Sequence, residues 1–359
     1  MSTATIIGNA TLDGIIGCPA CVGDYMLTFM THSGPVAVEV PSRDDGRGGP
    51  VAAGGKYTVA TLLYDLTVPW TPRFGGGGYN SATVLAGLIG GHADVVRSAP
   101  DAPRDAPIEL LRYLDLSTPA LDTGRPGVSA AQDLAALGIE PYFLSCRPMP
   151  FNLVVGGRAD KVILRSEITQ PTISPLHHDW IGTVLDASDA VLVNSAKDPF
   201  LLERAMQSGK TQLAVVTQSL PRDYVLNTVI DRTACQLNQD EIGYVARDAN
   251  PLSAIGQFSS LQKQLGLYVT LGSAGTLVAQ GDHVYQVQLT DAAKAQVGNA
   301  IAARDSASCG AGDAHAAGVF YAQMAGKGPI DCAIQGTLAA VAYLGFTAEH
   351  KDVLMEVIA

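Results

Sequence analysis

The 359-residue sequence predicts an α/β protein built on a mostly parallel sheet. Short apolar runs of strand length recur along the chain, and segments of helix length often separate them, an alternation typical of βαβ units. Helices would then cover both faces of the sheet. A chain of this length can bury a large core, and we expect one domain with insertions.

The elements follow in order from these patterns. The expected strands of the sheet span 3–8, 191–193, 213–216 and 267–271, and the expected helices span 80–88, 129–137, 199–207, 251–265 and 330–344. Residues 95–125 are rich in Pro and Asp and predict a surface excursion. No internal repeat is visible, so the pattern does not indicate a solenoid.

Residues 24–74 interrupt the α/β rhythm. The runs 36–40 and 57–68 are strand-like, and a polar glycine-rich turn at 42–55 separates them. This pattern predicts a β-hairpin or small sheet that projects from the core. We therefore divide the chain into an α/β domain, 1–23 and 75–359, and a β insertion at 24–74.

Composition narrows the class of protein. A net charge of −11 argues against a nucleic-acid partner, which would need concentrated Lys and Arg, and favours small-molecule ligands. No apolar run reaches the roughly 20 residues that span a bilayer, and the N-terminus lacks a signal-like pattern, so we expect a soluble, cytoplasmic protein. Cys18 and Cys21 have redox or zinc-ligand spacing, but no second pair completes a four-sulfur site, which favours two loop cysteines.

The most informative segment is 305–318, where a glycine-rich turn precedes an apolar run with helical character. Gly310, Ala311 and Gly312 leave room for a phosphate, and their N–H groups can point along the positive end of a helix. Asp313 follows in the same turn, where a carboxylate could take a proton from an attacking hydroxyl group. An ordinary helix N-terminus after a glycine turn would look the same, so other segments must decide.

A second glycine run precedes another apolar helix. Gly75, Gly76 and Gly77 would let a ligand approach the backbone, and the Asn80 amide offers a donor and an acceptor for hydroxyl groups. Asp13 follows the first strand, near the edge where open α/β sheets bind ligands. The alternatives are a flexible turn with an N-capping Asn80 and a solvated Asp13.

Two further strand ends carry polar residues. Asn238 and Glu241 could organise a hydrated Mg²⁺ at an expected strand-to-helix turn, and the same pair makes a good helix N-terminus. Thr270, Gly272 and Gly275 suit a nucleotide, and they also suit a β-turn.

Two other patterns indicate structure instead of chemistry. Residues 208–211 resemble part of a P-loop, but Arg204 takes the place of its first glycine and the segment ends a helix, so it predicts a helix C-terminus. His177 and His178 are adjacent in a polar helix and cannot share a face, which favours solvent exposure over a metal site.

Taken in order, these segments resemble the PfkB, or ribokinase-like, family of carbohydrate kinases over about residues 3–345. The fold implied is a mostly parallel sheet flanked by helices with a small β lid. The matching positions are Asp13, Gly75, Gly76, Gly78, Asn80, Asn238, Glu241, Thr270, Gly272, Gly275 and Gly310 to Asp313.

The resemblance also implies roles for these positions. Asp13 and the Gly75–Asn80 element would contact the sugar, and Asn238 and Glu241 would help to hold the Mg²⁺ environment. The element at Thr270 to Gly275 would contact the nucleotide. Asp313 would be the catalytic base, and the preceding amides, from Gly310 to Gly312, would form the anion hole. The segment 24–74 resembles an enlarged lid, which in the family closes over sugar and often mediates dimerisation.

The chain departs from the family pattern at three places. Residues 307–309 read Ala-Ser-Cys where members commonly have Asp-Thr-Thr, and the nearest acid is Asp305, which disfavours a monovalent-cation site. His315 stands where Phe is common. Gly77 stands where ribokinases and several phosphosugar kinases have Lys.

The hypothesis that follows is transfer of the γ-phosphoryl group of ATP, with Mg²⁺, to a hydroxyl group of a sugar or related polyol. A phosphosugar acceptor is an alternative, since the bases Arg147, Arg158, Lys161 and Arg165 could meet a second phosphate. A nucleoside acceptor is another. A non-catalytic sugar or nucleotide sensor on the same fold is the alternative of another class.

The insertion also predicts a partner. Tyr57, Val59, Leu63 and Leu66 belong to an apolar-rich segment of the insertion, and lid strands need cover for an exposed face and edge. We expect a homodimer joined through this region, the alternative being a lid packed on its own subunit.

Overall fold

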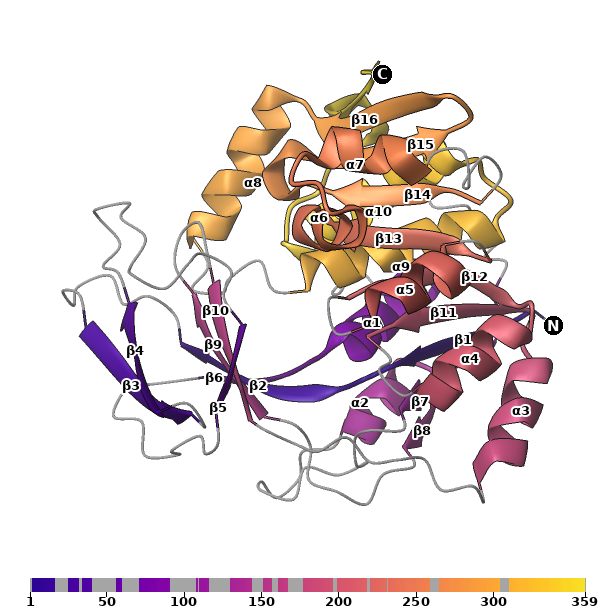
Figure 1. Cartoon of the computed structure of the whole chain (residues 1–359), viewed down its shortest axis with the longest axis horizontal. Helices are drawn as coiled ribbons and strands as arrows, with labels where there is room; N and C mark the ends of the chain where they lie inside the picture. The colour runs from indigo at the N-terminus through magenta and orange to yellow at the C-terminus, as the bar shows by residue number, and fades with distance from the viewer. Residues whose placement is uncertain are drawn as a thin grey trace.

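A computed structural model gives the fold of the chain. Of the 359 residues, it describes 2–16, 25–31, 34–40, 56–59, 71–90, 108, 110–115, 130–143, 151–156, 161–166, 177–195, 199–217, 220–230, 232–258, 265–303 and 310–358. A ten-stranded sheet with helices on both faces forms the main body, and two smaller sheets lie at one end of it (Figure 1).

The large sheet confirms the predicted fold class. Its strand order is β17-β16-β15-β14-β13-β12-β11-β1-β7-β8; all neighbours from β8 to β14 are parallel, and those from β14 to β17 are antiparallel. The strands are β1 (Thr3–Gly8), β7 (Leu110–Asp115), β8 (Ile139–Phe143), β11 (Ala190–Asn194), β12 (Thr211–Val215), β13 (Ala234–Asn238), β14 (Leu267–Thr270), β15 (Thr276–Gln280), β16 (His283–Leu289) and β17 (Val353–Val357).

Helices cover both faces of the sheet. Successive side chains of a strand point to opposite faces, so a strand with apolar side chains at successive positions needs cover on both. Ile6 and Ile7 of β1 are both fully buried, and each belongs to a different apolar cluster on its own side of the sheet. On the Ile6 side lie α1 (Gly77–Gly90), α2 (Ala130–Ala136), α9 (Ala311–Met324) and α10 (Pro329–Tyr343). On the Ile7 side lie α3 (His178–Asp186), α4 (Pro199–Gln207), α6 (Gln239–Ala246) and α7 (Pro251–Phe258).

Short elements and one further helix complete this body. They are α5 (Arg222–Tyr224), the π-helix η2 (Val225–Val229), the 3₁₀ turns η3 (Gly272–Ala274) and η4 (His350–Asp352), and α8 (Asp291–Ala303). None of the helices in the described part of the chain combines the length and the apolar character needed to cross a membrane.

Most of the predicted elements of the main body are confirmed, with shifted ends. The strand at 3–8 and the helix at 199–207 match, while α1 begins at Gly77, three residues before the prediction. The helix predicted at 251–265 ends at Phe258, and 259–264 lie outside the described residues. One prediction was wrong: 110–115, inside the supposed surface excursion, form β7, which pairs with the central strand β1.

The smaller sheets contain the strands that interrupted the α/β pattern. The five-stranded sheet has the order β5-β10-β9-β2-β6, and β3 pairs with β4 in a separate hairpin. Their bounds are β2 (Thr11–Ile16), β3 (Tyr25–Thr31), β4 (Gly34–Val40), β5 (Lys56–Val59), β6 (Thr71–Gly75), β9 (Phe151–Gly156) and β10 (Lys161–Ser166). Three strands of the larger of these sheets, β2, β9 and β10, lie outside 24–74, so this sheet extends beyond the predicted insertion.

Close helix contacts in the main body depend on glycine. A Cβ atom on Gly318 of α9 would lie 2.6 Å from the Gln335 carbonyl oxygen and 2.7 Å from the Ala339 Cβ atom of α10. A Cβ atom on Gly336 would lie 2.9 Å from the His315 ring. The two helices therefore pack at a separation that only glycine at these positions permits.

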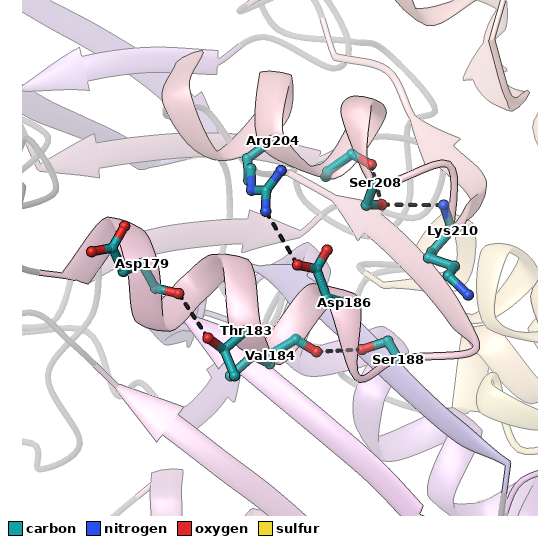
Figure 2. A network of polar contacts seen from close by, with 9 residues as sticks. Asp179, Thr183, Val184, Asp186, Ser188, Arg204, Ser208 and Lys210 are labelled. Carbon is teal, nitrogen blue, oxygen red and sulfur yellow. Dashed lines mark hydrogen bonds and ion pairs between the residues drawn. The ribbon is translucent and has the colours of Figure 1, made fainter.

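The segment with a partial P-loop pattern lies in a polar network that joins α3, α4 and the turn before β12 (Figure 2). Helix α4 ends at Gln207, and the Ser208 hydroxyl accepts a hydrogen bond from the Lys210 N–H at 3.1 Å. The Arg204 guanidinium lies 3.3 Å from the Asp186 carboxylate. The predicted helix C-terminus is confirmed.

The two adjacent histidines lie at the start of α3. Both side chains are half-buried, whereas solvent exposure was predicted. The His178 ring stacks on Phe200 of α4, with centroids 3.6 Å apart. This contact between helices explains the burial of His178.

Candidate active site

Asp313 is the third residue of α9, directly after the glycine turn. Gly310 begins the turn with φ 94°, in the left-handed region, and a Cβ atom there would collide with the Tyr343 hydroxyl and lie 3.0 Å from the Asn80 Nδ2 atom. Only glycine fits both restrictions. Gly312, by contrast, is exposed and a Cβ atom there would meet nothing within 4 Å. The turn is thus closely packed at Gly310 and open at Gly312.

Two asparagine amides hold the carboxylate of Asp313, one on each oxygen. Asn80 Nδ2 donates to Oδ2 at 2.9 Å, and Asn194 Nδ2 donates to Oδ1 at 3.1 Å. Both amides are buried, and Asn194 has no exposed surface. Residues 80, 194 and 313 come from α1, the end of β11 and α9, so tertiary structure builds the site.

Asn194 is a functional candidate that the sequence did not reveal. Its Nδ2 atom also lies within hydrogen-bonding distance of the Gly77 carbonyl oxygen (3.0 Å) and the Ser81 hydroxyl (2.9 Å), and the Ser195 hydroxyl donates to its Oδ1 atom at 3.1 Å. Ser195 itself has φ 59°, an uncommon conformation for a residue other than glycine. The signal in the sequence was a lone amide at the end of the apolar strand 190–194.

The glycine run before Asn80 packs against the chain itself. A Cβ atom on Gly76 would lie 2.5 Å from the Asn9 carbonyl oxygen, and one on Gly77 would lie 2.5 Å from the Asn194 Oδ1 atom. A Cβ atom on Gly78 would lie 2.5 Å from the Gly8 Cα atom. The glycines thus let α1 begin directly against the end of β1, and their role in substrate binding, with that of Gly75, stays a prediction.

Asn80 is not the helix N-cap of the alternative interpretation. Helix α1 begins three residues earlier, and the Asn80 N–H donates to the Gly76 carbonyl oxygen at 2.9 Å. Its side chain points to Asp313 instead of capping its own helix.

Asp13 does not directly follow the first strand, although the sequence had suggested that it does. Strand β1 ends at Gly8, and Asp13 is in β2 of the five-stranded sheet, opposite Arg73 of β6 and Asn152 of β9. Its side chain is outside the described residues. Its neighbour Arg73 donates to the Tyr343 hydroxyl, with the guanidinium carbon 5.1 Å from the centre of that ring, so β6 contacts the end of α10 beside Gly310.

Asn238 and Glu241 form a capping box at the start of α6. The Asn238 Oδ1 atom accepts from the N–H groups of Asp240 and Glu241, both at 2.9 Å, and the Glu241 Oε2 atom accepts from the Asn238 N–H at 2.8 Å. This bonding pattern agrees with the alternative interpretation of the sequence, in which the two residues form a helix N-terminus. Over the described residues, no group of three or more His, Cys, Asp or Glu side chains could hold a metal ion.

The turn after β14 lies next to this capping box. Thr270 is opposite Asn238 in the β13–β14 register, and its hydroxyl donates to the Leu237 carbonyl oxygen at 3.4 Å. Gly272 and Gly275 have φ of 62° and 96° in the tight connection to β15. The turn geometry agrees with the β-turn alternative, and nucleotide contact stays a prediction.

Parallel topology brings these elements to one edge. Gly8, Asn194, Asn238 and Thr270 end β1, β11, β13 and β14, and parallel strands end on the same side of a sheet. The start of α9, with Asp313, reaches this edge through Asn194. The site therefore has an acid at its centre, backbone donors beside it, and strand ends that can surround a ligand.

Comparison with protein-family models gives no match, and no curated protein matches the sequence. Solved structures do match. Adenosine kinase from Sinorhizobium meliloti superposes with a TM-score of 0.62 at 16% identity, covering 94% of this chain and 92% of that one.

Two other solved structures match at similar levels. Phosphofructokinase-2 from Escherichia coli gives a TM-score of 0.58 at 12% identity, covering 98% of this chain and 97% of that one. Ribokinase from Thermotoga maritima gives 0.56 at 14% identity, covering 95% and 92%. At these identities the likeness concerns the fold: the chain has the ribokinase-like fold over nearly its whole length.

Proposed function

We propose that the chain is a kinase that transfers the γ-phosphoryl group of ATP to a hydroxyl group of a sugar or related polyol. The observation that carries this proposal is the Asp313 carboxylate, held by Asn80 and Asn194 in the first turn of α9 beside the open Gly312. The similar folds of an adenosine kinase, a phosphofructokinase and a ribokinase support it.

Asp313 would act as the general base. An acceptor hydroxyl group that reaches either carboxylate oxygen can transfer its proton there while it attacks the phosphoryl group. The two amide donors orient the carboxylate without neutralising it, since both are uncharged. The Asp313 carboxylate would therefore be held in one orientation and could still accept a proton.

The N-terminus of α9 would stabilise the negative charge. The first backbone N–H groups of a helix have no partner within the helix, and the helix dipole is positive there. Gly312 leaves space for phosphoryl oxygens to approach these groups, since a Cβ atom at this position would meet no neighbour. Positioning and charge stabilisation are the main demands of phosphoryl transfer.

On the acceptor side, we propose that Asn80 contacts both Asp313 and the acceptor. Asp13 would bind acceptor hydroxyl groups from β2, and Gly75, Gly76 and Gly77 would set the backbone against which the acceptor lies. The contact of Arg73 with Tyr343 places β6 beside the Gly310 turn, which supports an acceptor site between the two sheets.

On the donor side, Thr270, Gly272 and Gly275 would contact the nucleotide. Mg²⁺ supplies charge neutralisation of the phosphates when it is bound. The capping box engages oxygen atoms of both Asn238 and Glu241, so these residues fit a role through water better than direct ligation. Mg²⁺ commonly keeps several of its waters and binds with substrate phosphates, which agrees with this role.

The test is turnover of the purified protein with ATP and Mg²⁺ on three panels: neutral sugars and polyols, sugar phosphates, and nucleosides. Transfer to a neutral sugar or polyol is expected. Transfer confined to sugar phosphates or to nucleosides would replace the acceptor class but keep the kinase. Binding of sugar and nucleotide without transfer to any acceptor would favour the sensor alternative.

A further inference from the structure

A chain of buried polar side chains ties the first turn of α9 to the sheet. Gln236 of β13 donates from Nε2 to the Gly312 carbonyl oxygen at 2.8 Å. Its Oε1 atom lies 2.8 Å from His315 Nδ1, and His315 Nε2 lies 2.9 Å from the Thr276 hydroxyl of β15. Three elements thus meet behind the turn that contains Asp313.

The bonds of this chain have one consistent direction. Because the Gln236 amide donates through Nε2, its Oε1 atom can only accept, so the proton of the His315 ring lies on Nδ1. The Nε2 atom then accepts from the Thr276 hydroxyl. Burial lowers the pKa of His315 to about 4, so the ring is neutral at pH 7 and this tautomer is fixed.

Packing leaves the ring no alternative position toward α10. Gln236, His315 and Thr276 are each at most 3% exposed. A Cβ atom on Gly336 would lie 2.9 Å from both the Cε1 and the Nε2 atoms of the ring, so the ring fills the space that this glycine leaves. Buried polar groups are costly unless they are bonded, and in this chain each one has a partner.

This geometry fixes a peptide unit of the candidate site. The Gly312 carbonyl group and the Asp313 N–H group belong to one planar unit, so a donor that holds the oxygen also sets the direction of the N–H. The same unit leads directly to the Cα atom that carries the Asp313 carboxylate. A carbonyl oxygen has two lone pairs, so the bond from Gln236 is compatible with helical bonding.

We propose that Gln236 and His315 are positioning residues, which hold the Gly312–Asp313 peptide unit so that the Asp313 carboxylate and N–H face the transferred phosphoryl group. This role rests on the proposed kinase function. Its competitor is a purely structural role, in which the three side chains only satisfy one another inside the core.

Variants can separate these roles because stability and positioning depend on different groups. Gln236→Leu removes the donor to Gly312 and leaves His315 Nδ1 unpaired, so it should lower both stability and kcat. The triple variant Gln236→Leu, His315→Leu, Thr276→Val replaces the whole chain by apolar groups of similar size. Replacing all the partners of a bonded buried chain restores much of the stability, but the Gly312 carbonyl still lacks its donor.

A third variant is a conservative rescue, because it keeps a donor near the Nδ1 position through which His315 acts on Gln236. In His315→Asn, the side-chain amide can donate to Gln236 Oε1 from nearly the position of Nδ1, so the bond from Gln236 to Gly312 is kept. The contact with Thr276 is lost. We expect kcat close to that of the wild type even though this variant loses stability.

The experiment measures three quantities in each variant: the thermal midpoint, kcat and KM on the best acceptor, and the amide resonance of Asp313 in protein labelled with ¹⁵N-aspartate. The positioning role predicts that kcat falls about 10- to 100-fold in Gln236→Leu and stays low in the triple variant, with KM for ATP little changed. The Asp313 resonance should move in both and stay in place in His315→Asn.

The contrary results are equally definite. If kcat returns with stability in the triple variant, the series of hydrogen bonds from Thr276 to Gln236 has only a structural role and the proposal is overturned. If the wild type transfers phosphate to no acceptor, the kinase proposal fails, and the resonance decides whether Gln236 positions the peptide unit. An unmoved Asp313 resonance in Gln236→Leu would then refute the positioning role as well.

Discussion

At the scale of the residue, the two amide contacts to Asp313 lead to a direct prediction. Asp313→Asn should lower kcat by roughly 10²- to 10⁴-fold, the range for loss of a general base. The new side chain has one oxygen in place of two, so it can accept from only one of Asn80 and Asn194, and some stability should be lost too. The measurement is steady-state turnover with ATP, accompanied by a nucleotide-binding titration.

Asp331→Asn gives the matched control for this change. Asp331 is also a carboxylate in the first turn of a helix, α10, and its side chain is exposed. Any general effect of losing a carboxylate at a helix N-terminus should appear in both variants. Near-normal kcat in Asp313→Asn, or equal losses in the two variants, would exclude Asp313 as the base.

Asn194 offers a second test at this scale. Asn194→Asp places a second carboxylate beside Asp313 Oδ1, and two like charges at that distance repel. The exchange Asn194→Asp with Asp313→Asn restores one donor and one acceptor but moves the base to residue 194. We expect the double variant to regain thermal stability relative to Asn194→Asp while kcat remains low. Recovery of kcat in the exchange would show that the position of the carboxylate does not matter.

The titration of His315 gives a prediction about stability and pH. Burial lowers its pKa from 6.5 to about 4, so the unfolded chain binds a proton more readily than the folded chain between these values. The contribution of the neutral His315 ring to the free energy of unfolding is fully present above about pH 6.5, and it is lost as the pH falls toward 4. It amounts to something on the order of 3 kcal/mol.

The check is chemical denaturation at pH 7, 5.5 and 4.5 of the wild type and His315→Asn. Asn does not titrate, so the free energy of unfolding of the variant should fall less over this range. Parallel curves for the two proteins would show that His315 does not titrate as its burial indicates.

At the scale of the element, the contact between α9 and α10 depends on glycine. Gly318→Ala should destabilise the fold by about 1–3 kcal/mol, because the added methyl group meets the backbone of α10 at 2.6 Å and only a backbone shift relieves the overlap. Gly256→Ala, in α7, is the matched control: a Cβ atom there meets nothing within 4 Å, and Ala is the better helix former, by roughly 0.5–1 kcal/mol. Thermal midpoints should therefore move in opposite directions.

The elements also show what a sequence can predict. Strands 3–8, 190–194 and 267–270 are buried on both faces, so their sequences are rich in apolar residues, and the sequence predicted them with ends shifted by at most one residue. Strand β7 was missed because its sequence Leu-Leu-Arg-Tyr-Leu-Asp mixes polar and apolar residues and follows a Pro- and Asp-rich segment.

The candidate site shows a similar division. Asp313 and the glycine turn are contiguous, so their pattern is visible in the sequence. Asn194 and Gln236 reach the same turn from β11 and β13, and their pairing with residues 313 and 312 depends on which strands lie side by side. Such contacts across 119 and 76 positions are set by tertiary packing, and no local pattern predicts them.

At the scale of the whole molecule, the homodimer through 24–74 remains our proposal. Much of this segment lies outside the described residues. Its described strands are β3, β4, β5 and most of β6, and β5 and β6 are the two edges of the five-stranded sheet that could pair with a second copy. Light scattering over a dilution series should give a dimer for the full chain, and a monomer when 43–65 are replaced by a short Gly-Ser loop. A full chain that is monomeric at micromolar concentration, or a loop variant that still dimerises, would move the interface elsewhere or remove it.

Two of the connections between the ten-stranded sheet and the five-stranded sheet are very short, which has a mechanical consequence. Only Asn9 and Ala10 separate β1 from β2, and only Gly76 separates β6 from α1. The two links pack against each other, since a Cβ atom added to Gly76 would lie 2.5 Å from the Asn9 carbonyl oxygen. These two short links could therefore act as a pivot for a rotation of the five-stranded sheet. Asn80 lies within about one helical turn of these links. A rotation about them would therefore move the far strands of the five-stranded sheet a long way and leave the hydrogen bond from Asn80 to Asp313 almost unchanged.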